Sequence, residues 1–72
     1  MREWLKKKRI EKGLTMAQMA SELMITESYY SLIEAGERQK KMDVVIVVRL
    51  SKALGIPITD IIIMEAAEEE NT

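Results

Sequence analysis

Residues 15–36 read TMAQMASELMITESYYSLIEAG, and this stretch decides the fold. Thr15 is followed three positions later by Gln18, which is the pattern of a capping box, so a helix is predicted to start directly after Thr15. Thr26 and Glu27 favour the start of another helix, because a hydroxyl caps the first backbone amides and a carboxylate is stabilised near them. Two short helices joined by so tight a turn are typical of a helix-turn-helix motif.

The same stretch also fits a plainer structure, an ordinary helical hairpin inside a five-helix bundle. Its apolar residues recur at three- and four-residue spacing, so they share one face of each helix, as either structure requires. These residues are Met16, Met19, Ala20 and Leu23 in the first helix and Tyr30 and Ile33 in the second. The apolar pattern by itself therefore leaves both interpretations open.

Helices are also predicted on both sides of this stretch. Residues 1–12 lack Gly, Pro and β-branched runs, and Gly13 supplies the left-handed residue that ends a helix. On the other side, an aspartate caps a segment over residues 43–54, and Gly55 ends it. Pro57 suits the first position of a final helix.

Local signals conflict within segment 43–54. Val44–Val48 are five consecutive β-branched residues, which favour a strand. A helix is still favoured, because a strand needs a partner strand and the sequence offers no other strand-like run except Ile61–Met64. The residues expected to face the core are Val44, Val47, Ser51 and Leu54 here and Ile58, Ile61 and Ile62 in the final helix.

The charges are unevenly distributed, although the formal net charge is −1. Four of the 12 acidic residues lie after Met64 without a base among them, and the other 8 face 11 basic residues, so the body carries +3. A weakly basic body with an acidic tail is compatible with DNA binding. We expect a compact, all-α, five-helix domain over residues 1–64 and an acidic C-terminal tail over residues 65–72 that is frayed or disordered.

The composition of the 72-residue chain narrows its function. A hydrophobic share of 47% is too high for a disordered chain. Histidine and cysteine are both absent, which removes the commonest general base, the thiolate nucleophile and the usual zinc ligands. We therefore expect no enzyme, no metal, no other cofactor and no small-molecule ligand. No apolar run approaches the ~20 residues of a membrane span, and a chain without cysteine fits a reducing compartment, so we expect a cytoplasmic protein.

Four short motifs occur in order along residues 5–62. They are Lys8-Arg9-Ile10-x-x-Gly13-Leu14-Thr15, Met19-Ala20-x-x-Leu23-x-Ile25-Thr26, Tyr30-Ser31-x-Ile33-Glu34-x-Gly36 and Leu50-Ser51-Lys52-Ala53-Leu54-Gly55-Ile56. The ordered set resembles the lambdoid phage repressor and Cro-like helix-turn-helix domains. This resemblance implies a lambda-repressor-like fold, with the second and third helices forming the motif and double-stranded DNA as the partner.

The resemblance also implies that the third helix enters the major groove of DNA. The candidates for reading bases are Glu27, Ser28 and Leu32, with Tyr29 and Ser31 beside them. A carboxylate can accept from a cytosine amine, a hydroxyl can serve either base, and an apolar group can touch a thymine methyl. The family more often offers Gln, Arg or Asn here. The plainer alternatives are a charge at a helix start for Glu27 and a partly solvated aromatic for Tyr29.

Contacts to the DNA backbone are expected from a different set of residues. The candidates are Arg38, Lys40, Lys41, Thr26 and Gln18. The three cations follow the third helix, where the family grips phosphates, although a solvated loop is the plainer alternative. The sequence departs from the family at Met16, where a phosphate-binding Gln is usual, and at Met24, where glycine is common. A positive φ at Met24 would cost roughly 1 kcal/mol.

Two further expectations concern the interior and the oligomeric state. The resemblance implies a structural ion pair between Arg9 and Glu34, which would tie the first helix to the third. Apolar residues outside the inward stripes predict a surface for self-association. They are Ile63, Met64, Ala67, Val45 and Ile46. The plainer alternative is that they close a small core over the first helix.

These observations predict a homodimeric, sequence-specific regulator of transcription, a repressor of the phage or mobile-element type. It would occupy a pseudo-palindromic operator with half-sites about one helical turn apart. The alternative is a protein-interaction module, such as the antitoxin of a toxin–antitoxin pair, with weak or no DNA binding.

Overall fold

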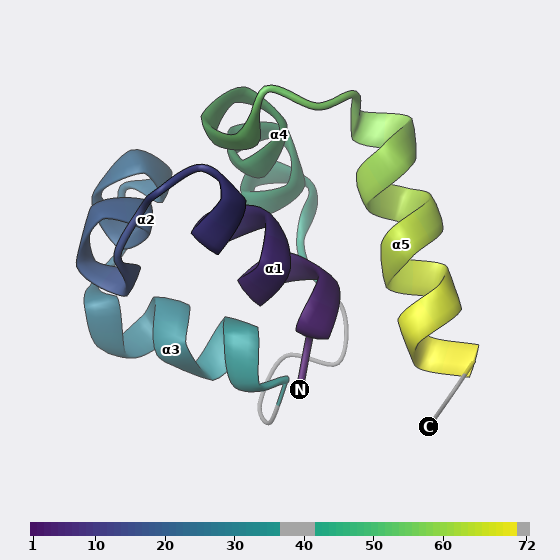
Figure 1. The fold of residues 1–72 in the computed structure, drawn as a ribbon, viewed down its shortest axis with the longest axis horizontal. Coiled ribbons are helices and arrows are strands. Elements are labelled where there is room, and N and C mark those ends of the chain that lie inside the picture. Colours follow the sequence, from purple (N-terminus) through teal and green to yellow (C-terminus); the bar gives the residue numbers. More distant parts are fainter. Residues whose placement is uncertain (37–41, 71–72) are drawn as a thin grey trace.

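The computed structural model describes residues 1–36 and 42–70. Within these ranges the chain forms helices and no strand, which confirms the all-α class (Figure 1). The helices are α1 (Glu3–Glu11), α2 (Met16–Leu23), α3 (Glu27–Ala35), α4 (Val44–Leu54) and α5 (Ile58–Glu70). The five β-branched residues of α4 are helical, as expected, because the segment lies between two helix caps and has no strand partner.

Polar side chains start three of the helices where the sequence predicted. The Thr15 hydroxyl accepts a hydrogen bond from the Gln18 amide at 3.1 Å, and the Gln18 side chain accepts from the Thr15 amide at 2.8 Å, which completes the capping box. The Thr26 hydroxyl accepts from the Tyr29 amide at 3.1 Å. The Asp43 carboxylate accepts from the Ile46 amide at 2.8 Å. These caps satisfy amides that have no partner inside a helix.

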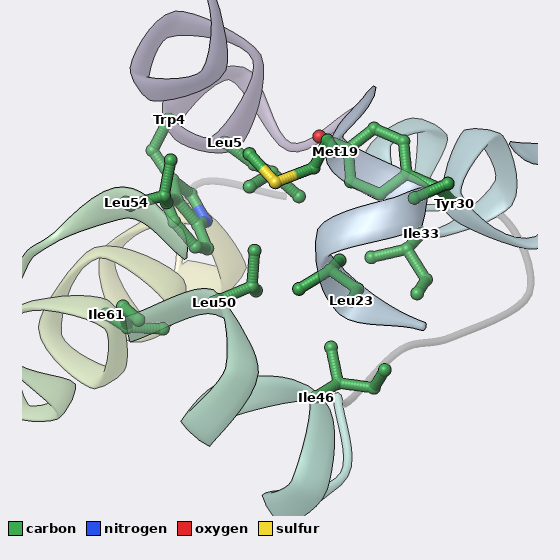
Figure 2. Close-up of a cluster of buried hydrophobic side chains, with 11 residues drawn as sticks. Trp4, Leu5, Met19, Leu23, Tyr30, Ile33, Ile46, Leu50, Leu54 and Ile61 are labelled. Carbon is green, nitrogen blue, oxygen red and sulfur yellow. The ribbon is translucent and has the colours of Figure 1, made fainter. Parts of the chain in front are cut away.

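The hydrophobic core draws on all five helices (Figure 2). Its members are Trp4, Leu5, Met19, Ala20, Leu23, Tyr30, Ile33, Ile46, Leu50, Leu54 and Ile61. The predicted inner faces of α2 and α3 are confirmed, because Met19, Leu23 and Tyr30 have no exposed surface. One core therefore fixes the helix-turn-helix against the other three helices.

The predicted inward stripe of α4 is confirmed at Leu54, which is buried, and Val47 and Ser51 are half-buried, but the prediction is wrong at Val44. Val44 is 77% exposed, whereas Ile46 is 4% exposed and forms the buried stripe with Leu50 and Leu54. Ile46 is therefore a core residue and not an exposed dimer residue, while Val45 is exposed. A run of five apolar residues permits several stripes, and the packing of α4 against α2 and α5 selects among them.

Helix α5 also differs from its prediction. Ile61 is buried as expected, but Ile58 and Ile62 are 40% and 56% exposed, so α5 buries a narrower stripe than the sequence indicated. The helix continues to Glu70, and Glu65 is half-buried against the N-terminal residues, where a frayed or disordered tail from residue 65 was expected. The run of alanines and glutamates after Met64 explains the extension, because both residue types are good helix formers.

Candidate nucleic-acid interface

One face of α3 is held by the core and the opposite face meets solvent. Tyr30, Ile33 and Glu34 are buried. The residues expected to read bases lie on the other side, where they share a shallow hollow lined by Glu27, Ser28, Ser31 and Leu32. The first three of these are exposed and Leu32 is half-buried. Figure 1 shows α3 along one edge of the molecule.

Among the base-reading candidates, Tyr29 is the one that packs against the hydrophobic core. It is half-buried and packs against the core, which favours the partly solvated aromatic role that the sequence left open. Its backbone amide also serves the Thr26 cap.

The turn before α3 is tight because Met24 adopts the left-handed conformation, with φ of 60°. The Ile25 amide reaches back to the Ala20 carbonyl at 3.0 Å, which closes a Schellman-type helix end. The guanidinium of Arg49, on α4, donates to the Leu23 carbonyl at 2.9 Å. Arg49 could not be predicted from the sequence, because no local pattern marks a residue that caps a helix 26 positions away.

A buried polar network joins α1 to α3. The Arg9 guanidinium donates to both carboxylate oxygens of Glu34, at 2.9 and 3.1 Å, and to the Leu14 carbonyl at 2.9 Å. The Tyr30 hydroxyl donates to the same carboxylate at 2.6 Å. Arg9 and Glu34 thus form the ion pair that the family resemblance implied, and Glu34 points away from the exposed face of α3.

The network shifts the protonation of its members. Burial by itself would raise the pKa of Glu34, but the hydrogen bonds from Arg9 and Tyr30 outweigh burial and hold that pKa below its usual value. The hydrogen bond to Glu34 raises the pKa of Arg9. Burial, followed by the hydrogen bond to the Glu34 carboxylate, raises the pKa of Tyr30. The pair is therefore charged and the tyrosine neutral at neutral pH.

The phosphate-contact candidates are described in part. Arg38, Lys40 and Lys41 lie outside the described residues. Gln18 and Thr26 are exposed at the starts of α2 and α3, with their side-chain oxygens engaged in the caps. Backbone amides at helix starts favour anions, so both positions are chemically suited to a phosphate.

Several exposed apolar side chains lie on α4 and α5, and others, such as Ile10 and Met24, are exposed elsewhere. Ile63 is 65% exposed, Ala67 is exposed, and Val45 is 53% exposed, as a surface for self-association requires. Met64 is half-buried and packs against the core. Val44 and Ile62 add to the exposed apolar area, although the sequence analysis placed both inside.

No described helix is both long enough and apolar enough to cross a membrane. Within the same residues, no cluster of three or more acidic side chains is arranged to hold a metal ion.

Comparison with known proteins agrees with the geometry. A helix-turn-helix family profile matches residues 5–61. A Bacillus subtilis (strain 168) protein described as the uncharacterized HTH-type transcriptional regulator YqaF is 42% identical over 55 residues, which cover 76% of this chain and 70% of the relative. No solved structure gave a significant match.

Proposed function

The chain belongs to the helix-turn-helix family, and we propose that it is a homodimeric, sequence-specific repressor of transcription of the phage or mobile-element type. Its partner is double-stranded DNA in the cytoplasm, with α3 in the major groove of each half of a pseudo-palindromic operator. The description of its Bacillus relative as a transcriptional regulator supports this proposal.

The observation that carries the proposal is the division of α3 into a fixed face and an exposed face. Three buried side chains anchor α3 to the core, a left-handed turn at Met24 precedes it, and the major groove admits one α-helix. The exposed face offers a carboxylate, two hydroxyls and an apolar side chain from Glu27, Ser28, Ser31 and Leu32. These groups match a cytosine amine, either base, and a thymine methyl, respectively.

Contacts to phosphates supply the remaining affinity in this proposal. Arg38, Lys40 and Lys41 follow α3 in the chain, and a base reader that enters the groove brings its flanking residues near the backbone. Gln18, in the first turn of α2, and Thr26, at the start of α3, would add further contacts to phosphates. Phosphate contacts of this kind fix the register and orientation of the protein on the duplex, while the α3 side chains supply the specificity.

Dimerisation uses α5 in this proposal, with Ile63 and Ala67 at the contact, and Val45 of α4 is a further candidate. An exposed apolar face of this kind on a small monomer favours a partner surface, and a two-fold homodimer is the commonest arrangement. Two copies of α3 would then face half-sites about 34 Å apart.

Salt-dependent binding to duplex DNA tests the regulatory function. A fluorescently labelled, mixed-sequence duplex is titrated with protein at several salt concentrations and followed by anisotropy. If about four to six phosphates per monomer are neutralised, the logarithm of the binding constant falls linearly with the logarithm of salt concentration, with a slope of roughly −0.9 per phosphate. Absence of binding even at low salt would overturn the proposal and favour a protein-interaction module.

Two charges on α5 test the dimer. Ile62→Asp combined with Ile63→Asp places carboxylates on exposed positions, so the monomer should still fold. We expect analytical ultracentrifugation to show a monomer that has lost affinity for paired half-sites. Ala17→Asp, at an exposed position of α2 and outside the proposed contact, is the control and should remain dimeric. A dimer that survives both charges would move the interface elsewhere.

A further inference from the structure

Arg2, which precedes α1, connects the C-terminal end of α3 with α5. The Arg2 amide donates to the Glu34 carbonyl at 2.8 Å, and Gly36 lies close to the Met1 backbone. Arg2 therefore crosses the C-terminal end of α3, where helix carbonyls lack partners within the helix. Its side chain is almost completely buried, with 5% of its surface exposed.

The Arg2 guanidinium bonds to α3 and α5 at the same time. Its Nη1 atom donates to the Ile33 carbonyl at 2.6 Å, while Nε and Nη2 donate to the Glu65 carboxylate at 2.8–2.9 Å. A planar guanidinium presents several donors in a fixed fork, so it can serve two acceptors that lie in different directions. A lysine ammonium is a single point charge and cannot reproduce this geometry.

Glu65 has a second donor on its other side. The indole Nε1 of Trp4 donates to the Glu65 carboxylate at 3.0 Å, so this one side chain is fixed by two residues of the N-terminal segment. Glu65 is 17% exposed, which limits competition from water. Figure 1 shows α1 between α3 and α5, and the Arg2 side chain bridges the separation at this end.

We infer that Arg2 and Glu65 are positioning residues that fix the orientation of α5 relative to α3, and thereby the half-site spacing that the dimer accepts. The inference rests on the proposed function, in which α3 reads DNA and α5 forms the dimer. A helix of 13 residues is about 20 Å long, so a small change of angle at Glu65 displaces the partner's α3 appreciably.

The two residues act on spacing and not on base identity. Arg2 contacts the carbonyls at the C-terminal end of α3, whereas the base-reading candidates lie on its opposite, exposed face. Loss of the bridge leaves each α3 anchored by Tyr30, Ile33 and Glu34. Each half-site is therefore still recognised, but the two halves are no longer held at a fixed distance.

The test begins with the wild-type protein and a pool of random duplex DNA, from which bound sequences are selected. Duplexes are then made with one selected half-site, with two at the selected spacing, and with two moved one base pair closer or farther apart. We expect the wild type to bind the selected spacing about tenfold more tightly than either altered spacing, a difference of about 1.4 kcal/mol. Glu65→Gln should bind all three spacings within about twofold, with unchanged affinity for the single half-site.

Three further variants separate positioning from stability. Arg2→Lys should behave like Glu65→Gln, and it serves as the test if Glu65→Gln fails to fold. Glu11→Gln breaks an exposed pair with Lys8 and should keep the wild-type spacing preference. Trp4→Phe loses the indole bond and some core packing but keeps the Arg2–Glu65 pair, so it should melt earlier and still prefer the wild-type spacing.

The outcomes distinguish the two proposals. If the wild type binds no DNA at low salt, the proposed function fails. If the wild type binds with a spacing preference that Glu65→Gln and Arg2→Lys both retain, the positioning role of this pair is overturned while the regulatory function stands.

Discussion

The half of the molecule formed by α1, α2 and α3 differs from the half formed by α4 and α5 in what sets the direction of its helices. In the first half, capping side chains and a buried ion pair accompany narrow apolar stripes. In the second half, apolar residues occur on several sides of both helices, and many stay exposed. Flanking polar residues thus mark the inward face of α2 and α3, whereas the apolar runs of α4 and α5 leave that face to tertiary packing, although Asp43 caps α4 and Glu65 pairs with Arg2.

The largest effect is expected where the polar network of the first half is broken. Arg9→Met leaves the Glu34 carboxylate, which is 2% exposed, without its guanidinium. We expect the free energy of unfolding to fall by about 3–5 kcal/mol, measured by urea denaturation. Lys8→Met, which breaks an exposed pair with Glu11, is the matched control and should change it by less than about 0.5 kcal/mol. Equal losses in both variants would mean that the buried Arg9–Glu34 pair contributes no more to stability than an exposed pair does.

A second effect tests the direction of α4. Ile46→Ala should lower the free energy of unfolding by about 2–5 kcal/mol, because it removes a core side chain and leaves a cavity. Its neighbour Val45 is 53% exposed, so Val45→Ala should change that free energy by less than about 0.5 kcal/mol. The reverse order would mean that α4 turns Val45 and not Ile46 toward the core.

Much of the fold follows from local sequence signals. Thr15, Thr26 and Asp43 predicted the starts of three helices, and the structure confirms each cap. The stripes of α2 and α3 were also predictable, because polar residues flank them. The stripe of α4 was not, since the β-branched run Val44–Val48 offers apolar side chains in every direction and only tertiary packing decides among them.

The site was predictable in part. The exposure of Glu27, Ser28 and Ser31 follows from the buried stripe of α3. The hydrogen bonds between Arg2 and Glu65 span 63 positions, and no local sequence pattern predicts that these two residues are partners. Charged residues near the ends of a chain are usually solvated, so burial of this pair emerges only when α1, α3 and α5 pack together.

Acid should lower the free energy of unfolding, because it protonates Glu34 in the polar network between α1 and α3. Its pKa is lower in the folded protein than in the unfolded chain, so its contribution to stability is complete above the unfolded value of about 4.3 and is lost as the pH falls through the folded value. Glu34→Gln should therefore flatten this part of the acid dependence in urea denaturation between about pH 6 and pH 3. Glu11→Gln, at an exposed position, is the control for the loss of one carboxylate. The same slope in wild type and Glu34→Gln would assign the acid sensitivity to other carboxylates.

The smallest effect concerns the turn between α2 and α3. Met24 is 74% exposed and has a positive φ, which disfavours every residue with a Cβ atom. Met24→Gly should raise the free energy of unfolding by up to about 1 kcal/mol, since the strain removed exceeds the added chain entropy. Gly55→Ala places a Cβ at a φ of 66° and should lower that free energy by about 1–2 kcal/mol. A destabilised Met24→Gly would show that the Met24 side chain has a role that its exposure conceals.

The reading of bases by the exposed face of α3 is tested most directly by selection from random duplex DNA with Glu27→Gln. Glutamine pairs with the edge of adenine, whereas glutamate accepts from cytosine, so one position of each selected half-site should change from cytosine to adenine. The spacing of the half-sites should match that of the wild type, because Glu27 is exposed at the N-terminal end of α3 whereas Arg2 bonds near its C-terminal end. Selection of the same bases by both proteins would contradict the account.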